Sequence, residues 1–329
     1  MVQVSRLAIG SLEIYPPLIL APMAGITDLP FRALAREQGA PLCFTEMISA
    51  QGLIRDGKNT ITLLRSNPGD RPLGIQLFGE DPEALAEAAR RVEDLCDVID
   101  INMGCPVKKV VAGGSGSALL RKPATVASIL RTVRKAVQIP LTVKIRTGWS
   151  SLEASFLEIS RIAELEGCDA ITLHPRTRAQ MFTEHADWDK LLELKQSSRV
   201  PIIGSGDIFS SKDIVDMLEQ TGCDGVMVAR GSLGNPWIFR EAADIIAGGN
   251  PRTPTTAERF STALKHLDSL QELYGEQTAV CEMRKHLSWY VKGLAGAARF
   301  RSDINTIVGM EPLRKAVEAF FTWMDDGNV

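Results

Sequence analysis

The sequence predicts an α/β protein, a (β/α)8 TIM barrel followed by a small helical bundle. Eight short apolar or β-branched runs recur, each followed by a helix-like segment, and such uninterrupted runs are typical of strands buried on both faces. The runs are Leu18–Met23, Leu42–Met47, Leu73–Phe78, Val98–Met103, Leu141–Arg146, Ala170–His174, Ile202–Ser205 and Gly225–Ala229. The alternation favours a closed barrel over a doubly wound open sheet, because no edge strand is left over.

The starts of these runs carry a second regularity. A proline opens strands three, five and seven, where it costs no ladder hydrogen bond, and a Cys-Asp pair opens strands four, six and eight. The residues are Pro72, Pro140 and Pro201, and Cys96-Asp97, Cys168-Asp169 and Cys223-Asp224. The repeating start signals support the same eightfold unit.

Three further segments complete the predicted organisation. Leu7–Ile14 has the pattern of a hairpin that could plug the lower mouth of the barrel, within a catalytic domain of residues 1–247. Residues 248–256 are rich in glycine and proline and predict a linker. Residues 257–329 carry apolar stripes at helical spacing and predict three or four bundled helices.

Composition excludes several classes of protein. A net charge of −3 is unlike a generic nucleic-acid binder, so any RNA contact needs a local basic patch. The apolar stretch Pro16–Ile26 is too short and too interrupted for a membrane span, and Arg6 and Glu13 flank no signal-peptide core. Six isolated cysteines argue against a disulfide framework or a zinc ribbon. We therefore expect a cytoplasmic protein that uses neither membrane nor metal.

Unusual polar residues lie at the carboxyl ends of the predicted strands, where barrel enzymes place their chemistry. They are Glu46, Gln76, Asn102, Lys144, Arg146 and His174. Such side chains on otherwise apolar strands are unfavourable unless they meet a polar ligand or one another. The pattern indicates a binding site, and a self-satisfied structural network is the alternative.

The loops after strands seven and eight each combine glycine with polar or basic residues, in Ser205-Gly206-Asp207 and Ala229-Arg230-Gly231. Glycine allows close backbone approach, and free amides can bind a phosphate at this position of the fold. Ordinary turns use glycine as well. The pair of loops nevertheless favours a phosphorylated cofactor.

Cys105 lies in the loop after strand four and precedes Lys108 and Lys109. A thiol near cationic side chains at the active end of a barrel can act as an acid or a nucleophile. A lone cysteine can equally be a packed small hydrophobe. Position alone leaves both readings open.

Several strings together resemble the tRNA-dihydrouridine synthases, and the bacterial B-type branch is the most similar. The strings are Ala21–Asp28, Asp100–Pro106, Lys144–Trp149, Arg176–Arg178 and His286–Tyr290. The resemblance implies FMN in the barrel mouth, reduced by NADPH or NADH, with hydride passing to C6 of a tRNA uridine and a proton from Cys105 to C5. It also suggests position 17 of the tRNA as the uridine.

The resemblance also implies roles for individual residues. Asn102 would orient the uracil, and Arg146, Arg176 and Arg178 would meet the RNA, whose target base must leave its stack. Lys144 would lie near N1 of the flavin, where positive charge stabilises the reduced form. The remaining expected flavin contacts are Pro22, Met23, Ala24, Gln76, His174, Ser205, Gly206, Asp207, Ala229 and Arg230.

Three positions depart from the family pattern. Pro175 stands where glycine is common, Ser205 where asparagine is usual, and Ala229 where glycine is usual. Serine and alanine can still serve a phosphate, whereas Pro175 removes a backbone donor and stiffens the loop before Arg176.

In the helical segment, a cluster of basic residues is the best candidate for holding RNA, although charged helix faces are commonly just solvated. It comprises Arg284, Lys285, His286, Lys292, Arg299 and Arg301.

Other functions fit parts of the pattern. A flavin barrel acting on a free pyrimidine, in the manner of dihydroorotate dehydrogenases, explains the flavin residues but gives the helical segment no task. An RNA-binding module without catalysis would be colourless. An aldolase forming a Schiff base through Lys144 would be trapped by borohydride.

Overall fold

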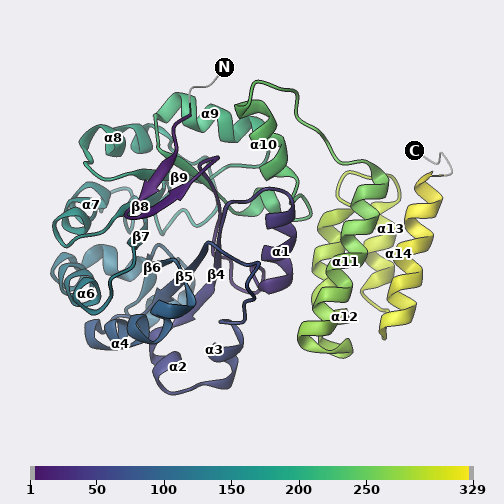
Figure 1. Cartoon of the computed structure of the whole chain (residues 1–329), viewed down its shortest axis with the longest axis horizontal. Helices are drawn as coiled ribbons and strands as arrows, with labels where there is room; N and C mark the ends of the chain where they lie inside the picture. Colours follow the sequence, from purple (N-terminus) through teal and green to yellow (C-terminus); the bar gives the residue numbers. More distant parts are fainter. Residues whose placement is uncertain (1–3, 326–329) are drawn as a thin grey trace.

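The computed structural model describes residues 4–325 and shows a closed barrel of eight parallel strands with four helices at one side (Figure 1). The barrel predicted from the sequence is confirmed, because the strands close in the order β10-β3-β4-β5-β6-β7-β8-β9. The strands are β3 (Leu18–Leu20), β4 (Leu42–Ser49), β5 (Leu73–Phe78), β6 (Val98–Met103), β7 (Leu141–Arg146), β8 (Ala170–His174), β9 (Ile202–Ser205) and β10 (Gly225–Val228).

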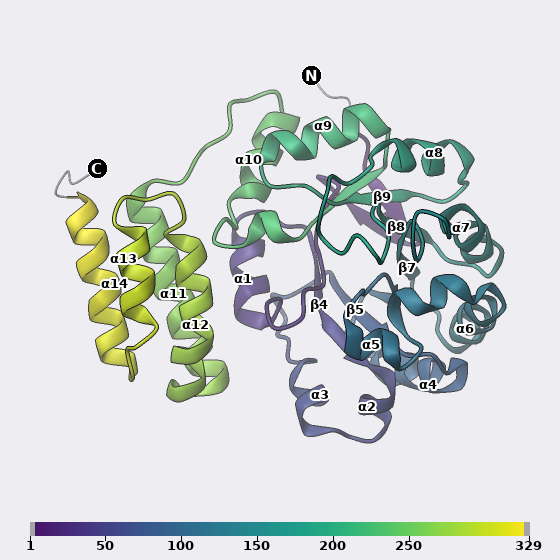
Figure 2. The same cartoon turned by 180° about the vertical axis from the view of Figure 1, so that it is seen from behind.

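Helices follow every barrel strand and cover the outside of the barrel, as Figures 1 and 2 show. Their apolar faces pack inward; α4, for example, buries Leu85, Ala89 and Val92. The helices are α1 (Leu29–Glu37), α2 (Ala50–Ile54), α3 (Lys58–Thr62), α4 (Pro82–Val92), α5 (Lys108–Ala112), α6 (Pro123–Ala136), α7 (Phe156–Leu165), α8 (Asp189–Ser197), α9 (Ser211–Thr221) and α10 (Ile238–Ile246), with short 3₁₀ helices η1 (Glu93–Leu95), η2 (Gly116–Arg121) and η3 (Arg230–Ser232).

The amino end of the barrel explains the Cys-Asp pairs at the strand starts. Each aspartate accepts a hydrogen bond from the first backbone N–H of the neighbouring strand that follows a proline. The pairs are Asp97 with Leu73 at 2.6 Å, Asp169 with Leu141 at 2.8 Å and Asp224 with Ile202 at 2.8 Å. These carboxylates satisfy otherwise unpaired donors and tie adjacent strands together. The regularity is structural.

A hairpin covers the same amino end. Strands β1 (Leu7–Ile9) and β2 (Leu12–Ile14) pair antiparallel, and Leu7, Ile9 and Ile14 are buried. These three side chains share an apolar cluster with side chains from the barrel strands. The carboxyl end of the barrel therefore remains as the end where a ligand can enter.

The barrel strands also carry a group of buried polar side chains. These are Gln76, Asp100, Asn102, Thr142 and Thr172. Buried polar groups are unfavourable unless they are hydrogen-bonded. Gln76, Asp100, Asn102 and Thr142 are hydrogen-bonded to one another, as described below, whereas the Thr172 hydroxyl has no partner among the described residues.

The first barrel strand is shorter than predicted, because the chain turns after Leu20. The carbonyl of Met23 accepts hydrogen bonds from the N–H groups of Ile26 at 3.0 Å and Thr27 at 3.1 Å. The Thr27 hydroxyl in turn accepts from Met23 N–H at 2.9 Å. Pro22, Met23 and Ala24 therefore lie in a loop at the carboxyl end and not in the strand.

Four helices form a second apolar core after residues 247–255, which contain no helix or strand. They are α11 (Thr256–Tyr274), α12 (Glu276–Tyr290), α13 (Ala297–Ile304) and α14 (Met310–Asp325). A capping box starts α11: Thr255 N–H donates to Glu258 at 2.8 Å, and Glu258 N–H donates to the Thr255 hydroxyl at 3.1 Å. Helix α11 packs against α1 of the barrel, and both views place the four helices beside α1 (Figures 1 and 2). The last four residues of the predicted helical segment lie outside the described residues.

Within residues 4–325, none of the helices has the length and apolar character needed to cross a bilayer.

Candidate active site

Four polar side chains form a hydrogen-bonded chain across strands β5, β6 and β7. Thr142 donates to Asp100 at 2.7 Å, and Gln76 donates to the second oxygen of Asp100 at 2.8 Å. The Asn102 amide donates to the Gln76 oxygen at 2.7 Å. Burial raises the pKa of Asp100 to about 6, against the opposing hydrogen bonds of Thr142 and Gln76 and the charge of Lys144. This chain fixes the orientation of Gln76 and Asn102.

Lys144 from β7 is a partly buried cation. Burial, followed by repulsion from Arg146, lowers its pKa to about 8, while Asp100 and Cys105 oppose that shift. Among the residues that the structure describes, the Lys144 ammonium makes no hydrogen bond and no ion pair. Because a desolvated cation without a partner is unfavourable, this position suits an anionic ligand group.

Cys105 is held by its backbone close to these charges. Its N–H donates to the Asn102 side-chain oxygen at 2.9 Å, and its carbonyl accepts from Ser117 N–H at 3.1 Å and the Ser117 hydroxyl at 3.0 Å. Burial raises the pKa of the thiol, and the backbone of Val107 and the charges of Arg146 and Lys144 offset this only in part. The thiol therefore keeps its proton at neutral pH, which suits an acid better than a nucleophile.

The cations that act on the Cys105 thiol in the structure are not the two lysines that follow it in the sequence. Lys108 and Lys109 are exposed residues of α5. The charges that influence the thiol are instead Arg146 and Lys144 from β7. Proximity along the chain was misleading here, because the cations whose charge acts on the thiol come from the neighbouring strand β7.

His174 at the end of β8 is a neutral imidazole. Burial, followed by the charge of Lys144, lowers its pKa well below the usual value. Its Nε2 lies 3.2 Å from Nη1 of Arg176. Because a guanidinium can only donate, Nε2 accepts and the proton is on Nδ1. His174 thus offers one N–H donor.

Asp207 anchors the loop after β9. It has a left-handed backbone, with φ 55°, and both its carboxylate oxygens lie 2.7 Å from Nη2 of Arg176. Burial alone raises the pKa of Asp207, but the N–H of Ala186 and the Arg176 guanidinium lower it below its usual value. Asp207 therefore stays ionised and joins the loops after β8 and β9.

The loops after β9 and β10 pack directly against each other. A Cβ on Gly231 would lie 2.3 Å from the carbonyl oxygen of Ile208, so only glycine fits there. Among the described residues, the backbone N–H groups of Gly206, Asp207, Arg230 and Gly231 donate no hydrogen bond. Free amides from two adjoining loops form the kind of concavity that binds phosphate.

Two of the arginines expected to face RNA are buried. Arg146 donates to the carbonyls of Gly104 at 3.0 Å, Thr177 at 2.9 Å and Met181 at 2.7 Å. Arg176 is 2% exposed and is held by Asp207. Both arginines hold the loop after β8 in the structure, and their contact with RNA stays a prediction. Arg178 differs, because it is only partly buried and stacks on Trp149 at 4.7 Å.

The sequence reasoning missed Phe182, which is half-exposed in the same loop. Arg146 and Arg230 both lie over its ring, at 5.4 and 4.9 Å from the centroid, and the His174 ring is 6.5 Å away. A lone aromatic residue in a loop gives no periodic signal. Asp100 and Thr142 were also missed, although a carboxylate within an apolar run was a signal that could have found Asp100.

The basic cluster expected in the helical segment is smaller than predicted. His286 is 2% exposed, and burial holds its pKa well below the usual value, so it is neutral. Arg284 donates to the Ile307 carbonyl at 2.6 Å, and Lys285 donates to a carbonyl of the barrel. Lys292 and Arg299 remain as exposed cations.

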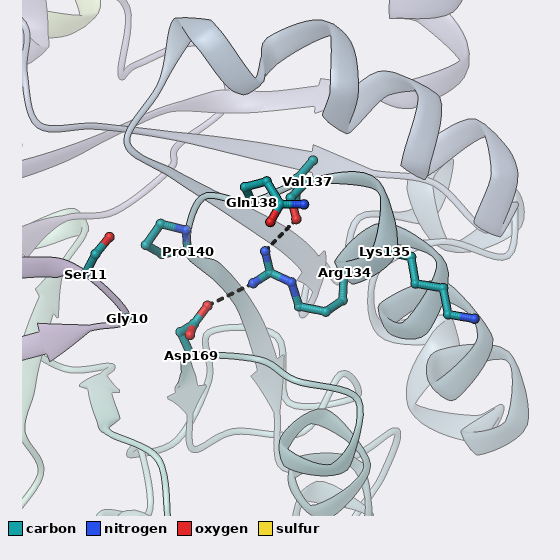
Figure 3. A pocket seen from close by; sticks show the side chains of 8 residues that line it. All are labelled: Gly10, Ser11, Arg134, Lys135, Val137, Gln138, Pro140 and Asp169. Atoms are coloured by element: carbon teal, nitrogen blue, oxygen red, sulfur yellow. Dashed lines mark hydrogen bonds and ion pairs between the residues drawn. The ribbon is translucent and has the colours of Figure 1, made fainter.

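A surface pocket of about 430 Å³ lies at the other end of the barrel, between the hairpin and the strand starts (Figure 3). Its arginine, Arg134, is already satisfied by Asp169 at 3.1 Å and the Val137 carbonyl at 2.7 Å. This pocket therefore offers no free charge from Arg134. Among residues 4–325 there is also no group of three or more His, Cys, Asp or Glu residues that could hold a metal.

The chain is similar to known proteins of one family along nearly its whole length. Residues 19–324 match the family model described as "Dihydrouridine synthase (Dus)". The chain is 40% identical over 320 residues to "tRNA-dihydrouridine synthase B" of Pseudomonas aeruginosa, covering 96% of both chains. It is 39% identical to the protein of the same name from Pasteurella multocida, covering 95% of both chains.

Solved structures with the same fold are much more distant. A histamine dehydrogenase from Rhizobium sp. 4-9 matches 80% of the chain with a TM-score of 0.54 at 14% identity. A 6-hydroxypseudooxynicotine amine oxidase from Pseudomonas geniculata matches 79% with a TM-score of 0.58 at 13% identity. The chain spans about half the length of these two proteins, at 50% and 52%, and they show the fold alone. The family-model match over nearly the whole chain and the 40% identity to a B-type member establish that the chain belongs to the dihydrouridine synthase family.

Proposed function

We propose that this protein reduces specific uridines in tRNA to 5,6-dihydrouridine in the cytoplasm, using FMN that is reduced by NADPH or NADH. The observation that carries the proposal is that two groups occur together at the carboxyl end of the barrel. One is the Cys105 thiol, which keeps its proton, and the other is the Lys144 ammonium, which has no partner among the described residues and whose charge acts on that thiol. Relatives named as tRNA-dihydrouridine synthases over 96% of their length support the choice of substrate.

The residues present fit an FMN. The free amides of the loops after β9 and β10 would hold its phosphate, together with Ser205, Gly206, Asp207, Ala229 and Arg230. Lys144 would supply the positive charge beside the ring, with Gln76 and the His174 Nδ1–H as further donors. Pro22, Met23 and Ala24 would lie against the ring. When bound, the reduced flavin supplies a hydride for C6 of the uracil.

The chain itself supplies the proton and the orientation. Cys105 Sγ–H donates to C5, which is the role that its raised pKa supports. Asn102 fixes the Cys105 backbone through its side-chain oxygen, while its amide nitrogen is held by Gln76. Replacing Asn102 would therefore move the proton donor as well as any uracil contact.

RNA would reach the mouth from the rim and from the helical segment. The target base must leave its stack to enter a barrel, which is least costly in a loop. Arg178, stacked on Trp149, is a partly exposed arginine of the rim, and Lys292 and Arg299 are exposed on the helical segment. We propose these three residues as phosphate contacts.

Cys105→Ala tests the proposal, with Cys281→Ala as the matched control because Cys281 is a free, exposed cysteine on α12. We expect Cys105→Ala to retain bound FMN and its reduction by NADPH but to lose most dihydrouridine formation, measured by mass spectrometry of unmodified tRNA transcripts. Cys281→Ala should match the wild type. Full activity in Cys105→Ala would overturn the assignment of the proton donor.

The choice of substrate is tested separately. The reduced protein should be reoxidised much faster by unmodified tRNA than by free uridine or orotate, and equal rates would favour a small-molecule reductase. Mass mapping of tRNA from a strain lacking the protein should show loss of dihydrouridine at the modified position, for which position 17 is our expectation.

A further inference from the structure

The turn after β3 is contacted by a helix that lies far away in the sequence. Gly25 donates its N–H to the Glu46 carboxylate of β4, and its carbonyl accepts a hydrogen bond from Lys285 Nζ of α12 at 2.6 Å. The same turn contains Met23 and Ala24. One peptide segment of the expected flavin loop is thus held between the barrel and the helical segment.

We propose that Lys285 is a positioning residue, which holds the Gly25 carbonyl and thereby fixes the position of Met23 and Ala24, the residues that would contact a bound flavin. The flavin part of this inference rests on the proposed function. The anchoring of the turn does not.

The position of Gly25 depends on contacts of its backbone. It is exposed, has φ 71° and has no side chain that could pack against a neighbour. A Cβ there would meet Lys285 Nζ at 3.9 Å, so the lysine lies directly over the turn. Glycine has more backbone conformational freedom than any other residue. The hydrogen bonds to Glu46 and Lys285 therefore remove more freedom from the backbone at Gly25 than they would at another residue type.

Lys285 acts on this turn in a second way, through Glu46. Burial raises the pKa of Glu46; the Gly25 N–H and the charge of Lys285 lower it again, and Glu282 opposes them. Lys285 therefore favours the ionised form of Glu46, and an ionised carboxylate accepts hydrogen bonds but cannot donate them. Loss of Lys285 weakens both hydrogen bonds of Gly25, one directly and one through Glu46.

The rest of the turn is anchored by contacts that do not involve Lys285, so the contribution of Lys285 can be tested separately. Arg32 donates to the Thr27 carbonyl at 2.7 Å, and Thr27 closes the turn on Met23. Tyr274 of α11 interacts with the Asp28 carboxyl at the start of α1. Removing Lys285 should loosen the Gly25 end of the turn and leave the Thr27 end in place.

Hydrogen exchange on the full-length protein without added flavin tests the anchoring. In Lys285→Met we expect the amides of residues 24–26 to exchange on the order of tenfold faster, as follows from losing a hydrogen bond to a charged group. The amides of Thr27 and Asp28 should keep the wild-type rate, because Arg32 still holds the Thr27 end of the turn. Lys285→Arg, which can still donate to the carbonyl, should restore slow exchange. The matched control is Lys265→Met, because Lys265 pairs with Glu37 of α1 and joins the same two parts of the molecule without touching the turn.

Flavin and RNA affinities then test the consequence. Lys285→Met should bind FMN on the order of tenfold more weakly, by fluorescence titration, whereas Lys265→Met should match the wild type. Binding of tRNA by the flavin-free variants should be equal. Failure of the wild type to bind FMN would sink the proposed function while leaving the exchange result to decide the anchoring.

Three results would overturn the inference about Lys285. One is exchange in Lys285→Met at the wild-type rate. A second is equal acceleration in Lys265→Met, which would indicate general loosening between the barrel and the helices. A third is weaker tRNA binding in Lys285→Met with unchanged exchange and flavin affinity, which would make Lys285 an RNA contact.

Discussion

Lys144→Met tests how much stability the protein loses by holding a charged lysine at the candidate site. Among residues 4–325 the Lys144 ammonium has no hydrogen-bond or ion-pair partner. Burial and Arg146 lower its pKa from the ordinary 10.5 to about 8. That difference corresponds to about 3 kcal/mol favouring the neutral amine. Methionine has a similar length and no charge. Since part of the lysine side chain still meets solvent, we expect the flavin-free variant to be about 1–3 kcal/mol more stable than the wild type at pH 7.

The stability difference between Lys144→Met and the wild type should depend on pH. A base with a lowered pKa in the folded protein binds its proton less tightly there than in the unfolded chain. The wild type therefore gains stability relative to the variant as pH rises from about 8 towards 10.5. Urea unfolding of both flavin-free proteins, followed by circular dichroism at pH 7 and pH 10, measures the two differences. The advantage of the variant should largely disappear at pH 10.

Lys135→Met is the matched control, because Lys135 is an exposed lysine on α6. It should change stability by less than about 0.5 kcal/mol at either pH. The reasoning is refuted if Lys144→Met is equally or less stable than the wild type at pH 7. It is also refuted if a gain at pH 7 persists unchanged at pH 10, since packing rather than charge would then explain it.

Three further predictions follow from the same contacts. FMN affinity of the wild type should fall by up to about tenfold per pH unit as pH rises above about 8, because Lys144 loses its charge there; a fluorescence titration with a flat profile would contradict this. Asp70→Asn should lower the free energy of unfolding by about 3–5 kcal/mol in urea, because it leaves the buried Arg32 without its carboxylate, and a loss below about 1 kcal/mol would argue against a charged pair. Thr255→Ala should cost about 1 kcal/mol by removing the capping box with Glu258, and unchanged unfolding would show that the linker holds the start of α11 by itself.

The sequence predicted the structure well where burial dictates which residue types follow one another along the chain. Strands covered on both faces must be apolar along their length, so eight such runs predicted the barrel. Polar residues on or at the ends of such runs are predicted to face the carboxyl mouth of the barrel, and this pattern pointed to Gln76, Asn102, Lys144 and His174. The short β3 was predicted less well, because the Met23–Thr27 turn depends on a threonine hydroxyl that has no periodic signal.

By itself, then, the sequence determined the barrel and the family, and it predicted the end of the barrel at which we propose the chemistry. Only the tertiary structure decided what the charged residues do. Arg146 and Arg176 are buried and hydrogen-bonded to a loop, whereas Lys144 has no such partner in the part of the chain that the structure describes. Lys285 holds Gly25, a residue 260 positions away. The physical reason is that burial patterns repeat along the chain, while the partner of a charge is chosen by distances in space, which adjacent residues do not encode.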